Sequence, residues 1–242
     1  MPKLPRAILF DLDDTILSVF GNPLATWERV AEEFAAAFAP LKPRDLGVLI
    51  EKRSRVLWGD PVWNKEWRVR ITEARRLIVA SAFAELAAAG GAILDAELGR
   101  SIADRFTAVR EEGVGVFPGA HETIDTLKRW GVRLALVTNG AAEPQRAKVI
   151  RFALGERFNH VQIEGEHGFG KPEERAYTHA MEALGVGPQD TWMVGDNLEW
   201  EIAAPQRLGI YAIWHDGYVN GLPPDCAVRP DRIIRSLPEL LL

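Results

Sequence analysis

The sequence has one cysteine among its 242 residues, Cys226. A single thiol cannot form a disulfide within the chain or supply the thiolates of a structural zinc site. Cys226 lies in the proline-containing segment LPPDCAV, which favours a passive loop residue over a nucleophile. This cysteine usage fits a reducing compartment, and we expect a cytoplasmic protein.

Long apolar runs and an excess of positive charge are also absent. No stretch of about 20 uncharged apolar residues occurs, so we expect no membrane span and no membrane partner. The opening MPKLPRAILFDLDD meets three acids too early for a secretory signal. The formal net charge of −5 gives no electrostatic reason to expect binding to nucleic acid.

Five short apolar runs predict strands that are covered on both faces. They are RAILFDLDD, VRLALVTNG, HVQIEGE, TWMVGDN and IYAIWHD. Segments with helical spacing lie between the later runs, at 119–131, 171–185 and 198–209, and Pro205 indicates a kink or a short first turn in the last. Strands that alternate with helices predict an α/β fold with a parallel sheet.

The segment from Pro23 to Gly113 has a different pattern, because it is nearly all helix-forming and contains no strand-like run. The strand pattern begins before this segment and resumes after it. We therefore predict a Rossmann-like α/β core made of residues 1–22 and 114–242, with a helical domain, residues 23–113, inserted into it.

Acidic side chains follow the first apolar run. Asp11 and Asp13 alternate with Leu12, so both carboxylates can project the same way from the end of a strand. Open parallel sheets bind ligands at that end, and paired carboxylates near backbone carbonyls suit Mg²⁺. For these two residues alone, a solvated acidic turn is the better interpretation.

Polar residues at the ends of the other runs decide between the two interpretations. One later run ends in Thr138-Asn139-Gly140, another ends in Gly195-Asp196-Asn197, and Lys171 follows flexible glycines between them. Together these residues offer a nucleophilic carboxylate, a second carboxylate for proton transfer, groups that bind an anion and acids for a divalent cation. This set predicts attack on phosphorus through an aspartyl-phosphate.

Four motifs in order resemble the haloacid dehalogenase-like hydrolase superfamily, whose members are mostly phosphatases. They are DLDDT at 11–15, VTNG at 137–140, GKPE at 170–173 and GDNLEWE at 195–201. The resemblance implies that Asp11 is the nucleophile and Asp13 the general acid/base. It implies that Thr138 and Lys171 hold the phosphoryl group with help from Asn139. It also implies that Asp196 binds Mg²⁺ together with the Asp11 carboxylate and the Asp13 backbone carbonyl.

The same resemblance assigns a role to the inserted helices and exposes one departure. The helical insertion looks like the cap that closes over the site and selects substrate in this family. The fourth motif usually ends in aspartate, and here that position is Glu201, which could bind a metal-bound water or brace Lys171. Asp14 and Thr15 are expected to shape the turn after the first strand.

The sequence therefore predicts a Mg²⁺-dependent phosphatase that acts on a small phosphorylated metabolite. A haloacid dehalogenase and a phosphomutase are the enzymatic alternatives, and a non-catalytic binding module is the third. Asp13 argues against the dehalogenase, because halide leaves without a proton. The five histidines are scattered without ligand spacing and predict no histidine metal site. The substrate and the oligomeric state, a homodimer included, stay open.

Overall fold

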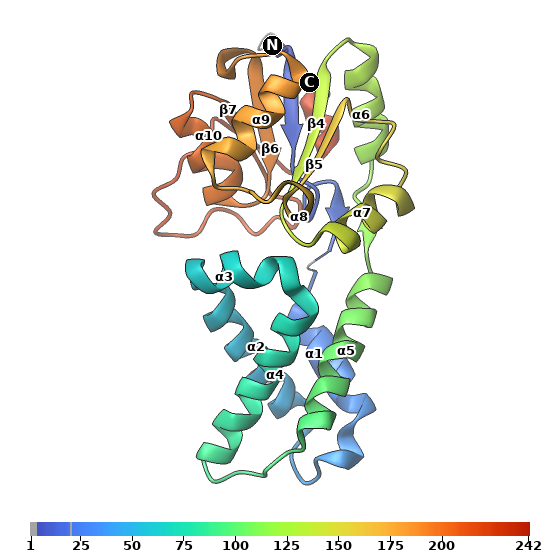
Figure 1. Ribbon diagram of the computed structural model, residues 1–242, viewed down its shortest axis with the longest axis vertical. Helices are drawn as coiled ribbons and strands as arrows, with labels where there is room; N and C mark the ends of the chain where they lie inside the picture. Colours follow the sequence, from blue (N-terminus) through green and yellow to red (C-terminus); the bar gives the residue numbers. More distant parts are fainter. Residues whose placement is uncertain (1–3, 20) are drawn as a thin grey trace. The chain divides into compact units, whose positions relative to one another are not determined.

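The computed structural model describes residues 4–19 and 21–242. The chain divides into two compact units (Figure 1): Met1–Ser18 with Gly115–Leu242, and Val19–Val114. The first unit contains the parallel sheet, and the second contains helices. The helical unit begins at Val19 instead of the expected Pro23, and it ends at Val114 instead of Gly113.

The first unit is built on a six-stranded sheet in which every neighbouring pair of strands is parallel. In spatial order its strands are β5 (His160–Ile163), β4 (Arg133–Thr138), β1 (Ala7–Phe10), β6 (Thr191–Gly195), β7 (Tyr211–His215) and β8 (Arg232–Ile234). The prediction of an α/β fold with a parallel sheet is confirmed, and the five expected runs each contain a strand. The edge strand β8 was not expected, because its three residues make too short a pattern to detect.

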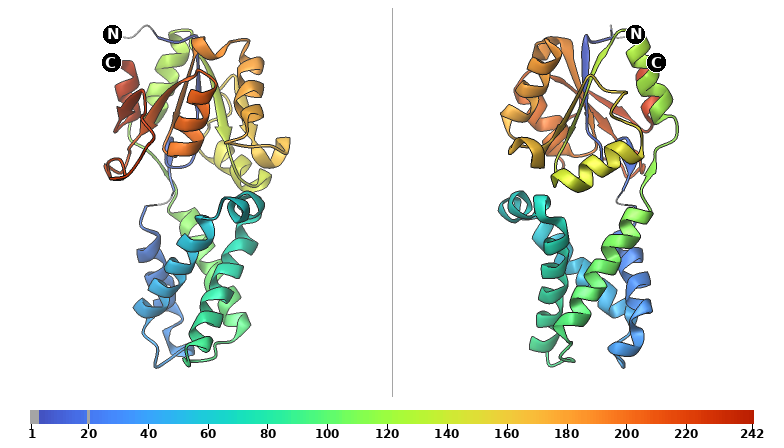
Figure 2. Two further views of the ribbon diagram at one scale, coloured as in Figure 1. Left: turned by 90° about the vertical axis from the view of Figure 1, so that its left-hand side faces the viewer. Right: turned by 45° about the vertical axis from the view of Figure 1, so that its right-hand side comes forward.

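Helices cover both faces of this sheet (Figure 2). They include α6 (Ala120–Arg129), α7 (Ala142–Arg151) and α9 (Glu174–Leu184). Every residue of β1 is fully buried, which explains why its sequence is apolar throughout. On one face, α9 packs Tyr177, Ala180 and Met181 against Ala7 and Leu9 of β1.

Short elements complete the unit. An antiparallel pair, β2 (Leu17–Ser18) and β3 (Gly115–Val116), forms where the chain leaves this unit and where it returns. The helix α8 (Glu164–His167) follows β5, and 3₁₀ turns occupy Pro188–Asp190 and Leu237–Leu241. The segment expected to kink near Pro205 is a π-helix over Leu198–Ala203 followed by α10 (Ala204–Arg207), with the proline in the first turn.

The second unit consists of α1 (Pro23–Glu33), α2 (Pro43–Trp58), α3 (Pro61–Trp67), α4 (Ile71–Ala88) and α5 (Ala96–Glu112), with 3₁₀ turns at Ala35–Ala37 and Arg68–Arg70. Side chains of Asn22, Asp60 and Asp95 accept hydrogen bonds from backbone amides in the first turns of α1, α3 and α5. The run of helix-forming residues from 65 to 90 is interrupted by the second 3₁₀ turn, because α3 ends at Trp67.

Aromatic packing forms the centre of the helical unit. The ring of Trp27 on α1 stacks on that of Phe106 on α5, with centroids 3.4 Å apart and planes 7° from parallel. Each buried side chain of this size stabilises the unit by about 1.5–3 kcal/mol. None of the helices in the described part of the chain is long and apolar enough to cross a bilayer.

Candidate active site

Three neighbouring strands of the sheet end at the same edge with polar side chains. The central strand β1 leads into Asp11, β4 ends at Thr138, and β6 leads into Asp196. The Asp11 amide donates to the Val194 carbonyl at 3.0 Å, which extends the pairing of β1 with β6 by one residue. Strand order thus brings Asp11 together with residues that follow it by more than 100 positions in the sequence.

Lys171 lies fully buried between two carboxylates. Its Nζ is 2.5 Å from Oδ1 of Asp11 and 2.7 Å from Oε1 of Glu201. The Thr15 hydroxyl donates to the other oxygen of Asp11, Oδ2, at 3.0 Å. Glu201 also uses Oε2 to accept the Asn197 amide at 2.8 Å, so both of its oxygens are engaged. Of the roles considered for Glu201, the structure shows the contact that braces Lys171.

Burial sets the ionisation of this cluster. Burial raises the pKa of Asp11, although the neighbouring Lys171 ammonium opposes the shift. Burial likewise raises the pKa of Glu201 to about 7, again against the pull of Lys171. Burial alone would lower the pKa of Lys171, but the Coulomb attraction of Asp11 and Glu201 outweighs it and raises that pKa. The lysine therefore stays protonated, and it is the positive charge of the cluster.

Asp196 adds a third carboxylate, which has no ion pair of its own among residues 4–19 and 21–242. Burial raises its pKa well above the usual value, and the charges of Asp11 and Glu201 add to the effect. The indole of Trp214 donates to the Asp196 backbone carbonyl at 2.6 Å and fixes the main chain there. With all three carboxylates ionised, a single ammonium would leave an excess of negative charge. Carboxylate oxygens from Asp11 and Asp196 fit a hard divalent cation such as Mg²⁺, which would balance that excess.

Asp13 is held by two residues that the sequence analysis did not identify. Nζ of Lys148 is 2.8 Å from both carboxylate oxygens of Asp13, and Nε2 of Gln145 donates to Oδ2 at 3.0 Å. Both partners lie on α7, three residues apart, and so share one face of that helix. The only sequence signal is this spacing just after the VTNG motif, which is too common to be specific.

Gln145 also connects Asp13 with the end of β4. Its Nε2 donates to Oγ1 of Thr138 at 2.7 Å and to the Asn139 carbonyl at 3.0 Å. The Asn139 side chain forms two hydrogen bonds with the backbone of Lys171: Nδ2 donates to its carbonyl at 2.7 Å, and Oδ1 accepts from its amide at 2.8 Å. The structure thus shows Asn139 positioning Lys171, and its expected contact with a phosphoryl group stays a prediction.

The turn after β1 is shaped by Asp14. This residue has a left-handed backbone with φ of 59°, and its amide donates to the Leu17 carbonyl at 2.6 Å. Its carboxylate accepts a hydrogen bond from the Tyr218 hydroxyl at 2.8 Å. Thr15 is part of the same turn, yet its hydroxyl contacts Asp11 directly, which the sequence analysis did not anticipate.

A family model described as haloacid dehalogenase-like hydrolase matches residues 5–209, most of the chain and all of the site. The chain belongs to this family. The resemblance drawn from the four motifs is therefore confirmed.

Curated relatives are phosphatases. The phosphoserine phosphatase of Thermus thermophilus is 31% identical, with 98% of each chain covered. The glyceraldehyde 3-phosphate phosphatase of Pyrococcus furiosus is 32% identical over 57% of this chain and 55% of the relative. The full length of this hydrolase therefore has a counterpart in one relative, and about half of it has a counterpart in the other.

Solved structures resemble both units together. The HAD-hydrolase YfnB of Bacillus subtilis, solved bound to magnesium, has a TM-score of 0.70 and 26% identity and covers 98% of this chain and 97% of its own. A 2-haloacid dehalogenase of Pseudomonas syringae has a TM-score of 0.60 and 27% identity, with 98% of each chain covered. The fold is thus shared by hydrolases with different reactions.

Two positions in the motifs require glycine, because neighbouring side chains leave no room for a Cβ atom. A Cβ on Gly195 would lie 2.0 Å from Cγ of Glu201, and one on Gly170 would lie 2.7 Å from Oδ1 of Asn139. Any side chain at these positions would displace the residues that hold Lys171. The glycines of this hydrolase thus serve the geometry of the cluster as well as the turns.

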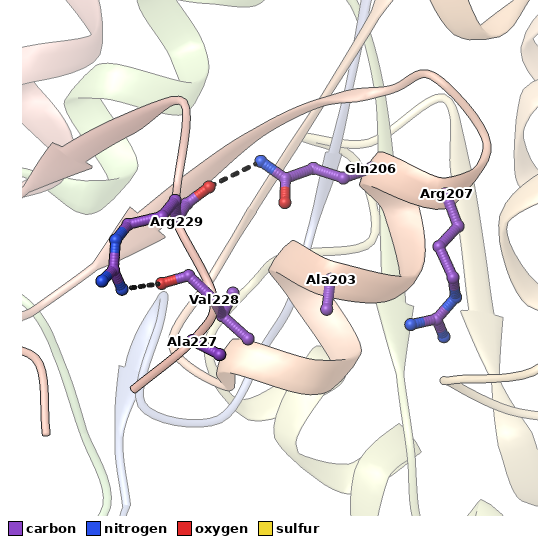
Figure 3. A pocket seen from close by; sticks show the side chains of 6 residues that line it. All are labelled: Ala203, Gln206, Arg207, Ala227, Val228 and Arg229. Atoms are coloured by element: carbon purple, nitrogen blue, oxygen red, sulfur yellow. Dashed lines mark hydrogen bonds between the residues drawn. The ribbon is translucent and has the colours of Figure 1, made fainter. Parts of the chain in front are cut away.

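A surface pocket has a lining that includes none of the residues of the carboxylate cluster (Figure 3). It is lined by Ala203, Gln206, Arg207, Ala227, Val228 and Arg229. Nε2 of Gln206 donates to the Arg229 carbonyl at 2.8 Å and ties α10 to the segment before β8. Its lining contains no carboxylate and no nucleophile, so the chemistry of this hydrolase is assigned to the strand ends.

Proposed function

We propose that the protein is a Mg²⁺-dependent phosphatase that hydrolyses a small phosphomonoester through an aspartyl-phosphate on Asp11. The observation that carries this proposal is the placement of the buried Asp11 carboxylate between the Lys171 ammonium and the Thr15 hydroxyl at the end of the central strand. A second carboxylate, Asp13, follows two residues later.

The assignment to the phosphoric monoester hydrolases rests on sequence similarity to known proteins. The chain is a phosphoric monoester hydrolase of the haloacid dehalogenase-like family, as its family match and its full-length relationship to a phosphatase indicate. The relatives act on phosphoserine and glyceraldehyde 3-phosphate, which makes small phosphorylated metabolites the substrate class to test first. Selection of substrate by the helical unit remains a prediction of the family resemblance.

Asp11 attacks phosphorus in the first step. A bond forms between a carboxylate oxygen of Asp11 and phosphorus, and the bond from phosphorus to the ester oxygen breaks. Lys171 places a permanent positive charge beside the attacking carboxylate, where the negative charge of the transferring group is spread over its equatorial oxygens. The Thr15 hydroxyl orients the carboxylate.

Asp13 acts as the general acid in the first step and as the general base in the second. It donates a proton to the leaving ester oxygen, then takes one from the water that attacks the phosphorus of the aspartyl-phosphate. That second attack breaks the bond between phosphorus and the Asp11 oxygen, and it releases phosphate and the free carboxylate. Because Lys148 and Gln145 contact the Asp13 carboxylate, Asp13 must exchange one of these contacts when it faces substrate.

The carboxylates of Asp11 and Asp196, with the backbone carbonyl of Asp13, would hold Mg²⁺. When bound, the ion offsets the excess negative charge of the cluster and the charge of the phosphoryl group. Magnesium bound to the related YfnB supports this choice of ion.

The metal requirement and the reaction class are tested in one assay series. We expect p-nitrophenyl phosphate to be hydrolysed with Mg²⁺ and not with EDTA, and activity to return when Mg²⁺ is restored. A panel that includes phosphoserine and glyceraldehyde 3-phosphate then ranks natural substrates by kcat/KM. Metal-independent release of chloride from a 2-haloacid would instead assign a dehalogenase, and transfer of phosphate between positions of one sugar would assign a mutase.

The intermediate is tested by mass. Acid quench during turnover should leave a fraction of the protein heavier by one phosphoryl group, located on the peptide that contains Asp11. Asp11→Asn should abolish both turnover and labelling while its circular dichroism spectrum matches the wild type. Retained turnover in this variant would refute the nucleophile, whatever the substrate proves to be.

A further inference from the structure

Three histidines of the α/β unit come together outside the carboxylate cluster. His160 is the first residue of β5, His167 is the last residue of α8, and His179 lies on α9. One ring nitrogen of each lies within 4.8 Å of a ring nitrogen of the other two. Their spacing in the sequence gives no sign of this cluster, because three separate elements contribute one residue each.

Hydrogen bonds fix the tautomers of two of these rings. Nδ1 of His167 faces the Ile163 carbonyl at 3.1 Å, and Nδ1 of His179 faces Oε1 of Gln162 at 2.8 Å. A carbonyl oxygen only accepts, so each Nδ1 carries the proton and each Nε2 keeps its lone pair. Gln162 cannot turn its amide around, because its Nε2 donates to the Ala176 carbonyl at 2.8 Å. Partners of this kind orient histidine ligands in metal sites.

The third ring, that of His160, has one nitrogen without a hydrogen bond. Nε2 of His160 is buried and has no hydrogen-bond partner among the described residues. A buried ring nitrogen without a hydrogen bond is costly, and a metal ion would satisfy it. Each of the three residues is partly exposed, although the Nε2 atom of His160 is buried.

We propose that His160, His167 and His179 bind a divalent transition-metal ion, with Zn²⁺ as the ion that best suits three imidazoles and one open position. Tetrahedral ligands at zinc–nitrogen distances of about 2.0–2.1 Å lie about 3.3 Å apart, so the rings close by up to roughly 1.5 Å when the ion binds. Nitrogen donors separate this site from the oxygen donors proposed for Mg²⁺, since each donor type selects its own ion.

The position of the site gives the ion a structural role. Two ligands precede Lys171 in the sequence and one follows it, so the ion would tie together both ends of the segment 168–178. That segment supplies the backbone of Lys171, which Asn139 already fixes through two hydrogen bonds. Bound metal would thus stabilise the α/β unit around the catalytic lysine without contacting substrate.

The test measures binding, not catalysis. The untagged, metal-stripped full-length chain is titrated with Zn²⁺ in a large excess of Mg²⁺, which occupies the oxygen-donor site. Affinity comes from competition with a chromogenic chelator, and Co²⁺ serves as a second probe through its visible absorption. We expect one equivalent of Zn²⁺ to bind, an intense tetrahedral Co²⁺ spectrum, and a melting temperature that rises with Zn²⁺ concentration.

Variants decide where the ion binds. His160→Asn and His179→Asn should each weaken Zn²⁺ binding about tenfold or more, since each removes a ligand. His121→Asn, on α6 outside the cluster, should bind like the wild type. Asp11→Asn should also keep the site, because it changes only the carboxylate cluster. Two ligand variants are used because the Nε2 atom of His160 is buried, and a substitution there can prevent folding. If one variant does not fold, the other still tests the proposal.

Three results would overturn the proposal. One is the absence of Zn²⁺ binding to the wild type in excess Mg²⁺. Another is equal affinity in His160→Asn, His179→Asn and the wild type. The last is loss of binding in Asp11→Asn, which would place the ion at the carboxylates. None of these results bears on hydrolysis, so the metal site and the proposed phosphatase activity fail or stand separately.

Discussion

The helical unit buries mostly aromatic and aliphatic side chains such as Trp27 and Phe106, with Glu51 and Arg110 among its buried charges, whereas the α/β unit buries Asp11, Lys171 and Glu201 together at the ends of its strands. Ion pairs of the helical unit, for example Arg76 with Asp104, lie where both side chains are substantially exposed. Such surface pairs contribute only about 0–1 kcal/mol. Apolar burial therefore dominates the helical unit, while the α/β unit keeps a cluster of paired buried charges at the ends of its central strands.

Buried charge is retained where it does chemistry. Removing ions from water carries a desolvation penalty that pairing only partly offsets, so a buried pair is weak evidence of stability. The same low dielectric strengthens the interaction of Lys171 with any negative charge that develops beside Asp11. Substitutions in the two units should therefore have different effects. Those at the strand ends should lower turnover, and those in the helical core should lower the stability to unfolding.

Lys171→Met should have the largest effect, because it removes the only cation from the buried pairs with Asp11 and Glu201. We expect kcat to fall by on the order of 10³-fold and the free energy of unfolding to fall by about 3–5 kcal/mol. Urea denaturation and steady-state kinetics measure the two effects. Lys52→Met, which breaks an exposed pair with Glu85, is the matched control and should change neither quantity appreciably.

Trp27→Ala tests how far apolar packing stabilises the helical unit. It removes the ring that stacks on Phe106 in the helical core, and we expect the helical unit to lose about 3–5 kcal/mol of stability. Urea denaturation followed by far-ultraviolet circular dichroism checks this. Val62→Ala, at a side chain that is 78% exposed, should unfold like the wild type. Equal midpoints for the two variants would show that the stacked pair does not stabilise this unit.

The sequence could predict the fold and the carboxylates because both depend on local patterns. Apolar runs covered on both faces mark β1, β4 and β6, and the strand ends of a parallel sheet must meet at one edge. Asp11 and Asp196 therefore become neighbours once the order of the strands is fixed. The interruption of the run from 65 to 90 was missed, since no proline or glycine separates Trp67 from Ile71.

Contacts between distant side chains could not be predicted in the same way. Lys148 and Gln145 reach Asp13 because α7 follows β4 and β4 pairs with β1, a tertiary arrangement with no sequence signature beyond ordinary helix spacing. The three histidines meet for a similar reason, across a strand and two helices. For Asn139, the motif indicated a polar group at the site, but it did not indicate whether the amide faces substrate or the backbone of Lys171.

The pKa of Glu201 predicts a pH dependence of stability. Its folded-state pKa of about 7 lies above the ordinary 4.5, so between these values the native carboxyl keeps a proton that the unfolded chain has lost. Stability should therefore fall as pH rises from about 4.5 to about 7, by up to about 3 kcal/mol, and then level off. Glu201→Gln should flatten this part of the profile when unfolding is measured with EDTA present. An unchanged profile would mean that Asp11 or Asp196, and not Glu201, carries the buried proton.

Lys148→Ala should have the smallest effect of these substitutions. Lys148 is a positioning residue, and it acts on substrate only through its contact with Asp13. Losing a charge-assisted hydrogen bond to Asp13 should raise the activation barrier by about 1–3 kcal/mol, seen in kcat with little change in KM. The matched control on the same helix is Arg146→Ala, whose pair with Glu166 lies at the surface.

A merely structural role for Lys148 would lower stability and leave kcat per folded molecule unchanged, so both quantities are measured. The leaving group separates the two cases further. An alkyl phosphate needs a proton on its departing oxygen, and p-nitrophenol leaves without one. If Lys148 positions the proton donor, Lys148→Ala should slow phosphoserine hydrolysis more than hydrolysis of p-nitrophenyl phosphate. Equal losses on both substrates would contradict the assignment of proton transfer to Asp13 with Lys148 behind it.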